Sequence, residues 1–153
     1  MNAIPLTMFD LAQRFVGIQE IAGAQHQPFV QWCHSLVALG TDQPDETPWC
    51  SSFTNAMAWI LRLPRSKSAM ARSWLNVGTP IGLHDATPGF DVVVFWRGSK
   101  DAATGHVGLY AGVERRDGKE VILVLGGNQG DSVSIAPYPA DRLLGVRRLR
   151  DAA

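Results

Sequence analysis

The sequence has few cysteines, no excess of charge of either sign and no long apolar run. Its 153 residues include only Cys33 and Cys50, which are too few for a disulfide framework and suit free thiols in a reducing compartment. The 14 basic and 14 acidic side chains balance, so no basic surface argues for a nucleic acid or an anionic membrane as partner. No stretch approaches the roughly 20 apolar residues of a transmembrane helix. These scarcities favour a soluble globular protein.

The chain also lacks signs of export, of division into domains and of metal binding. Residues 1–15 contain no basic segment followed by an apolar run, so we expect synthesis in the cytoplasm without a signal peptide. A chain of this length can bury one core without cross-links, and no repeat or linker divides it, so we expect a single domain, residues 1–153, and a monomer. No C-x₂-C or H-x₃-H spacing is present, which makes a zinc site the weakest alternative and predicts neither metal nor other cofactor.

The apolar period changes from helical to extended along the chain. Steps of three and four residues predict four helices, over residues 8–18, 28–37, 48–62 and 68–75. Thr7 and Asp10 form a capping box before the first helix, and Pro28 can open the second. After Pro88, β-rich runs predict five strands, over residues 90–96, 106–113, 120–126, 132–136 and 144–149. Helices followed by strands indicate an α+β domain with helices packed on one face of an antiparallel sheet.

Residues 45–53 place Cys50 at the start of the third helix. Thr47 is a suitable N-cap and Pro48 suits the first helical position, which would make Cys50 the third helical residue. Unpaired N–H groups and the helix dipole favour a thiolate there, which predicts a lowered pKa and a reactive sulfur. Apolar residues follow Cys50 at helical spacing, so we expect the thiol to face an interior cleft; they are Phe53, Met57 and Ile60. An inert buried thiol is the alternative, and it is the better interpretation for Cys33.

A cysteine nucleophile needs a base, and four histidines are available. Three of them are explained by surface positions: His26 lies in a polar loop, His34 on the side of a helix expected to face water, and His84 in a connection between elements. His106 differs because it opens a strand between glycines at 105 and 108, which let a substrate or another segment approach the backbone. We therefore predict that His106 is the base.

The hairpin that follows His106 predicts the residue that orients it. Residues 116–118, Arg-Asp-Gly, suit a three-residue turn with glycine in the left-handed position. Strand pairing counted from that turn sets His106 opposite Asn128, about 5 Å away, where an amide oxygen can hold one imidazole nitrogen. A one-residue slip would substitute Gln129. An ordinary Asn- and Gly-containing loop over residues 126–131 is the alternative.

Three segments resemble the signatures of small papain-like cell-wall hydrolases: Trp-Cys-Ser-Ser-Phe at 49–53, Gly-His-Val-Gly-Leu-Tyr at 105–110 and Gly-Gly-Asn-Gln at 126–129. These enzymes are the CHAP and NlpC types of cysteine peptidase and amidase, and the chain is most similar to a compact single-domain group from phages and prophages. The resemblance runs over nearly the whole chain. It implies a papain-like fold and catalytic Cys50, His106 and Asn128. Many CHAP-type members have glutamate where Gly126 stands, so a four-residue mechanism is not implied, and a separate role for Glu46 stays open.

The resemblance further implies that Trp49, Trp74 and Gln129 contact the substrate, with core packing an equal alternative for Trp74. A Cys-His-Asn set predicts acyl transfer to water through a thioester, with the Cys50 N–H in the oxyanion hole. The implied substrate is peptidoglycan, and the implied role is a phage or prophage endolysin that acts on the wall after release. The bond could lie in the stem peptide, in its cross-link or between peptide and sugar. Alternatives are an interbacterial toxin, a thiol acyltransferase and a non-catalytic wall-binding module.

Overall fold

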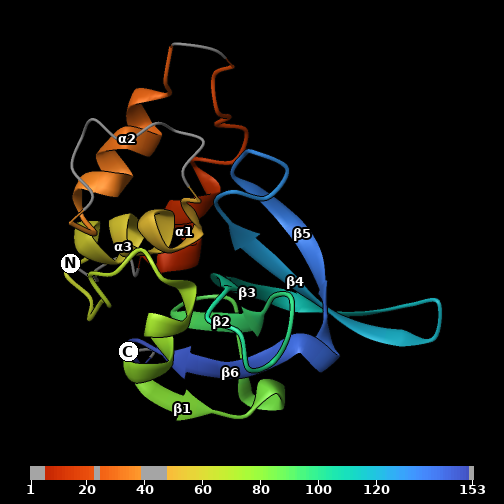
Figure 1. Ribbon diagram of the computed structural model, residues 1–153. Coiled ribbons are helices and arrows are strands. Elements are labelled where there is room, and N and C mark those ends of the chain that lie inside the picture. The colour runs from red at the N-terminus through yellow and green to blue at the C-terminus, as the bar shows by residue number, and fades with distance from the viewer. Residues whose placement is uncertain (1–5, 23–24, 39–47, 152–153) are drawn as a thin grey trace.

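The computed structural model describes residues 6–22, 25–38 and 48–151. Helices come first and strands second, which confirms the α+β class (Figure 1). The α-helices are α1 (Met8–Gln13), α2 (Pro28–Ser35) and α3 (Cys50–Ile60), and the short 3-10 helices are η1 (Ala71–Asn76), η2 (Leu83–Asp85) and η3 (Ala140–Arg142). The strands are β1 (Thr79–Ile81), β2 (Asp91–Trp96), β3 (Gly105–Arg116), β4 (Lys119–Gly126), β5 (Ser134–Pro139) and β6 (Leu143–Arg148).

The N-terminal helix begins as its sequence predicts and ends early. The Thr7 hydroxyl accepts from the Asp10 backbone N–H at 3.0 Å, and the Asp10 carboxylate accepts from the Thr7 N–H at 3.1 Å. The helix stops at Gln13 rather than near residue 18, and residues 17–20 instead hydrogen-bond to the loop over 131–133. This pairing joins the start of the chain to the loop that follows β4, close to the expected site.

The described strands form one antiparallel sheet in the order β1-β6-β2-β3-β4-β5. Sequence patterns missed β1, a three-residue edge strand that contains Pro80; edges are where proline is tolerated because one side of the strand needs no ladder bond. Alternate side chains of β2 serve two cores: Val92 and Val94 pack under the helices, whereas Val93 and Phe95 join a smaller cluster on the opposite face.

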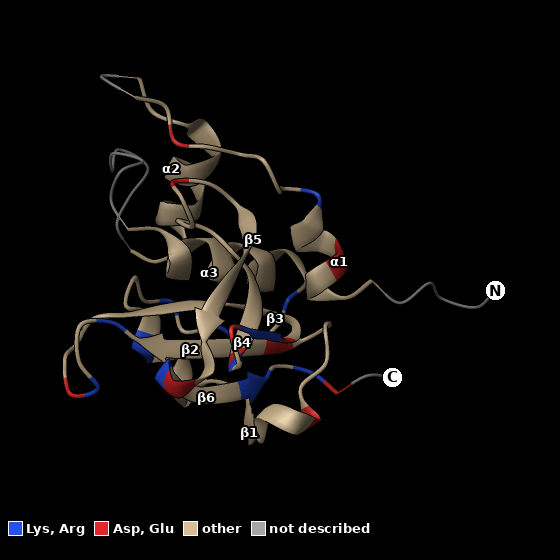
Figure 2. Cartoon of the chain, turned by 90° about the vertical axis from the view of Figure 1, so that its right-hand side faces the viewer, with Lys and Arg blue, Asp and Glu red and all other residues tan. Residues whose placement is uncertain are grey.

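Helix α3 is the central element of the helical layer, and its burial fixes where Cys50 lies. Nine of its eleven residues are buried, and neither α2 nor α3 contains a Lys, Arg, Asp or Glu. Figure 2 accordingly shows few charges on these helices and more on the strands and connecting loops. No helix in the described part of the chain is long and apolar enough to cross a bilayer.

The β3–β4 hairpin differs from the three-residue turn that the sequence predicts. The turn consists of two residues, 117–118, both with positive φ, as in the tight turns that suit twisted hairpins. A bulge immediately after Tyr110 then shifts the register by one residue. Leu109 consequently pairs with Leu125, as the longer turn would have given, and the ladder ends at Gly126. The bulge therefore restores the predicted pairing, and the end of the strand decides which residue reaches His106.

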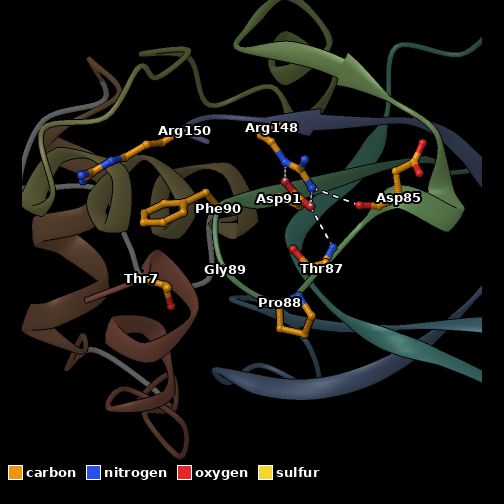
Figure 3. Close-up of a pocket in the computed structure, with 9 residues that line it drawn as sticks. All are labelled: Thr7, Asp85, Thr87, Pro88, Gly89, Phe90, Asp91, Arg148 and Arg150. Carbon is orange, nitrogen blue, oxygen red and sulfur yellow. Dashed lines mark hydrogen bonds and ion pairs between the residues drawn. The ribbon is translucent and has the colours of Figure 1, made fainter. Parts of the chain in front are cut away.

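An ion pair with a buried carboxylate joins two strands of the sheet. Asp91, 1% exposed, accepts from Nε and Nη2 of Arg148 at 2.8 Å each and from the Thr87 backbone N–H at 2.8 Å (Figure 3). The bidentate contact ties β2 to β6 and holds the connection that precedes β2. A cavity of about 330 Å³ lies beside this pair, and none of the expected site residues lines it.

Candidate active site

Cys50 is the first residue of α3, not the third. The expected cap Thr47 lies outside the described residues, Pro48 precedes the helix, and Trp49 is the N-cap with φ −126° and ψ 15°. The Trp49 indole N–H donates to a Glu20 carboxylate oxygen at 2.7 Å, and its ring is fully buried. This anchored side chain sets the point at which the helix begins. As a first-turn amide, the Cys50 N–H has no acceptor within its own helix.

Burial decides the protonation of the Cys50 thiol. The side chain is 6% exposed, and desolvation raises its pKa above the ordinary 9.0, while the Val107 backbone N–H and the charge of Arg97 act in the opposite direction. The predicted lowering of this pKa is wrong, because loss of water outweighs the field of the helix start. At neutral pH the sulfur therefore carries its proton and needs a base to remove it.

His106 is buried, uncharged and held on two sides. Its ring Nε2 lies 2.9 Å from Oε1 of Gln129, and the Tyr138 ring stacks on it with centroids 4.5 Å apart and planes 11° from parallel. Burial lowers the pKa of His106 from 6.5 to about 4; the Gln129 hydrogen bond raises it, and the Arg97 charge lowers it further. The neutral ring that results at pH 7 can accept a proton.

The Gln129 amide determines which imidazole nitrogen is free. Its nitrogen donates to the carbonyl oxygens of Val124 at 3.0 Å and Ser134 at 2.8 Å, so its oxygen must face His106. An oxygen accepts, so the hydrogen-bond network assigns the ring proton to Nε2 of His106. The buried Nδ1 keeps its lone pair and has no hydrogen-bond partner among the described residues. This is the tautomer that a general base requires.

Gln129 thus takes the place that strand pairing predicted for Asn128. The ladder ends at Gly126, and Asn128 turns the chain with φ 58°, which carries the following side chain to His106. The expectation that Asn128 lies beside His106 is therefore wrong by one residue. Gln129, predicted to contact the substrate, is 4% exposed and directs its amide to His106 and the backbone.

Both tryptophans expected to contact the substrate are core residues. Trp49 and Trp74 are fully buried, and the Trp74 indole N–H donates to the Ser51 hydroxyl at 3.0 Å. A Cβ at Gly127 would lie 2.6 Å from the Trp49 ring, so the glycine pair before Asn128 lets this loop pack against the helix start. The two rings support α3 and do not form a wall for substrate.

An open cavity of about 270 Å³ lies beside Cys50. Its lining residues are Pro48, Cys50, Ala69, Met70, Ala71, Arg97, Ala103, Thr104 and Gly105. The cavity therefore brings the start of α3 together with the residue that precedes His106. No hydrogen bond joins the Cys50 thiol to the ring in the described structure; catalytic contacts of this kind often tighten only when a substrate binds. Sequence patterns missed two residues of the site: Arg97, which follows β2 and lines the cavity, and Tyr138 of β5, which stacks on His106.

The remaining histidine and cysteine residues have structural surroundings. His34, expected to face water, is fully buried with Nδ1 2.9 Å from the Ser52 hydroxyl, because α2 packs its polar edge against α3. Cys33 is fully buried, and burial raises its pKa. His84 is exposed. Among the described residues, no three His, Cys, Asp or Glu side chains are grouped to hold a metal ion.

The low pKa of His106 predicts acid sensitivity of the fold. Below pH 6.5 the unfolded chain gains a proton that the folded chain excludes until about pH 4, so the free energy of unfolding should fall as pH decreases through this window. At about 1.4 kcal/mol per pKa unit the full loss is on the order of 3 kcal/mol. Urea denaturation at pH 7 and pH 4.5 should show a smaller loss for His106→Gln than for the native chain. His26→Gln is the control, and an equal loss in all three proteins would refute the assignment.

No protein-family model matches the chain, and no curated protein matches it either. The residues and their geometry, together with the three motifs, therefore carry the function proposed below.

Proposed function

We propose that the protein is a cysteine hydrolase that cleaves amide bonds of bacterial peptidoglycan. The observation that carries the proposal is the hydrogen bond from His106 Nε2 to Gln129, which leaves a neutral, proton-accepting Nδ1 on this second residue of β3. Cys50, at the start of the buried helix α3, supplies the nucleophile and lines the adjacent cavity. A neutral thiol and a neutral imidazole give a general-base mechanism in place of a resting thiolate.

The first step forms a thioester. As the Cys50 sulfur attacks the amide carbon, its proton passes to Nδ1 of His106, and the Gln129 oxygen stabilises the imidazolium through Nε2–H. The Cys50 backbone N–H, first in its helix, is placed to donate to the developing oxyanion. The low basicity of His106 then favours rapid transfer of the proton to the departing amine, which leaves the acyl group on sulfur.

The second step returns the enzyme to its starting state. Water attacks the thioester carbon while His106 accepts one of its protons, and collapse of the tetrahedral intermediate releases a carboxylic acid. The same proton returns to the Cys50 sulfur, so the thiol and the neutral ring are regenerated. No redox change occurs, and the balance requires only water.

The choice of peptidoglycan is supported by the motifs around Cys50, His106 and Gln129, which resemble those of CHAP-type wall hydrolases. The arrangement of helices on an antiparallel sheet is consistent with the papain-like fold of that family. On the same resemblance we propose a lytic role in a phage or prophage, as a monomer that reaches the wall after synthesis in the cytoplasm. A secreted antibacterial toxin would use the same site and the same chemistry.

Replacement of the nucleophile should abolish cleavage and leave the fold intact. Purified sacculi are digested with the native chain, Cys50→Ala, Cys50→Ser and Cys33→Ser, and the soluble muropeptides are analysed by mass spectrometry. We expect new amine and carboxyl ends with the native chain and Cys33→Ser, and none with either Cys50 variant, whose circular dichroism should be unchanged. Cys33→Ser should unfold more easily, since it places a hydroxyl at a fully buried position.

The same digestion separates the competing functions. Retention on sacculi without any bond cleavage by the native chain would overturn the hydrolase proposal and favour a wall-binding module. Capture of the acyl group by an added amine in preference to water would favour a thiol acyltransferase. Loss of activity in Cys33→Ser but not in Cys50→Ala would show that the nucleophile is Cys33 on α2 and that the assignment to Cys50 on α3 is wrong.

Gln129 should matter more to turnover than Asn128. Removal of its amide frees the His106 ring to rotate and to adopt the other tautomer, so Gln129→Ala should lower kcat by about 10–100-fold with little change in KM. Asn128→Gly, which suits the positive φ at that position, should retain most activity. Initial rates on sacculi with both variants, each checked by circular dichroism, measure this difference. A large kcat loss for Asn128→Gly together with a normal Gln129→Ala would contradict the assignment.

A further inference from the structure

Arg97 lines the same cavity as Cys50, and its side chain has no partner in the described part of the chain. It follows β2 directly, its side chain is exposed, and among the described residues its guanidinium has no hydrogen bond or ion pair. It is also the one charged residue among the nine that line the cavity. A guanidinium that no described residue pairs, beside the proposed nucleophile Cys50, is available to a ligand.

The backbone that carries Arg97 is held firmly. The Arg97 N–H donates to the Thr104 carbonyl oxygen at 3.3 Å, and the Thr104 hydroxyl donates to the Arg97 carbonyl oxygen at 2.8 Å. The Arg72 guanidinium from η1 closes the loop by donating to three carbonyl oxygens, those of Ser99, Lys100 and Thr104, at 3.0, 2.7 and 2.9 Å. Because the backbone at Arg97 is already fixed, less conformational entropy is lost when its side chain binds a ligand.

The rest of the cavity selects the chemical character of that ligand. Small or apolar side chains form most of its wall, and they are Ala69, Met70, Ala71 and Ala103. Among the described residues, no carboxylate lines it to compete for the guanidinium. The charge of Arg97 also influences the pKa of both Cys50 and His106, so the guanidinium lies within electrostatic reach of the reacting atoms. An aliphatic acyl group that bears an anion fits these walls better than a neutral or basic one.

We propose that Arg97 determines specificity by binding a free carboxylate of the peptide next to the scissile amide. This inference rests on the proposed function, because it names a feature of the substrate at the same site. The planar guanidinium can hold a carboxylate through two parallel hydrogen bonds, which fixes the orientation of the peptide as well as its charge. Amidation of that carboxyl group would remove the anion and leave the scissile bond unaltered.

Two sets of soluble muropeptides test the inference. One set is prepared from sacculi with a muramidase, and the other is the same material with its carboxyl groups converted to primary amides. The native chain should cleave the acidic set with a kcat/KM about 10–100-fold higher, as for a charge-assisted hydrogen bond. Arg97→Gln should lose that preference and cleave the acidic and amidated sets with equal kcat/KM. Lys100→Gln, a charge removal three residues along the same loop, is the matched control and should behave as the native chain does.

A binding measurement separates this inference from the proposed function. With Cys50→Ala, calorimetric titration should give a Kd for the acidic set about 10–100-fold lower than for the amidated set, and Arg97→Gln in that background should equalise them. Preferential binding that depends on Arg97 would support the carboxylate site even if the native chain cleaved no bond. Cleavage of both sets at equal rates, or equal losses on both sets in Arg97→Gln, would overturn the inference and leave the hydrolase intact. Equal effects of Lys100→Gln and Arg97→Gln would also overturn the inference, because the preference would then reflect the overall positive charge of the loop and not a contact with Arg97.

Discussion

The site depends on the anchoring of one side-chain amide. Because the Gln129 nitrogen is committed to the backbone oxygens of Val124 and Ser134, its oxygen faces His106. That single orientation places the imidazole proton on Nε2 and leaves Nδ1 basic. The two anchoring carbonyls belong to β4 and to the first residue of β5, so the sheet itself selects the tautomer. Any change in the path between these strands would alter the chemistry of His106.

Burial then determines how the site can work. Desolvation raises the pKa of the Cys50 thiol and lowers that of His106, and both shifts favour the neutral pair at pH 7. Arg97 adds positive potential that favours thiolate but disfavours imidazolium. For the reaction that we propose, the neutral pair is suited to concerted proton transfer as the sulfur attacks. Tyr138 stacks on the His106 ring and limits its rotation.

Sequence patterns succeeded where the determinants are local. The α+β order, the capping box at Thr7 and the proline start of α2 follow from periodicity and from residue types within a few positions. The helix-start position of Cys50 was also predictable, whereas the hydrogen bond that anchors the preceding Trp49 to Glu20 spans 29 residues and was not. Counting along the hairpin gives the observed pairing of Leu109 with Leu125, but the ladder ends at Gly126 and the chain turns at Asn128, so the count could not choose between Asn128 and Gln129.

The distant parts of the site were beyond such patterns. The order of the strands brings Tyr138 to His106, and the loop that Arg72 closes brings Arg97 to the cavity beside Cys50.

The proposed mechanism can be tested most directly by ¹⁵N NMR of the His106 ring at neutral pH, with Gln129→Ala as reference. We expect a neutral ring with its proton on Nε2 and an unprotonated Nδ1, and loss of that single tautomer in the variant. A proton on Nδ1, or a charged ring at pH 7, would contradict it.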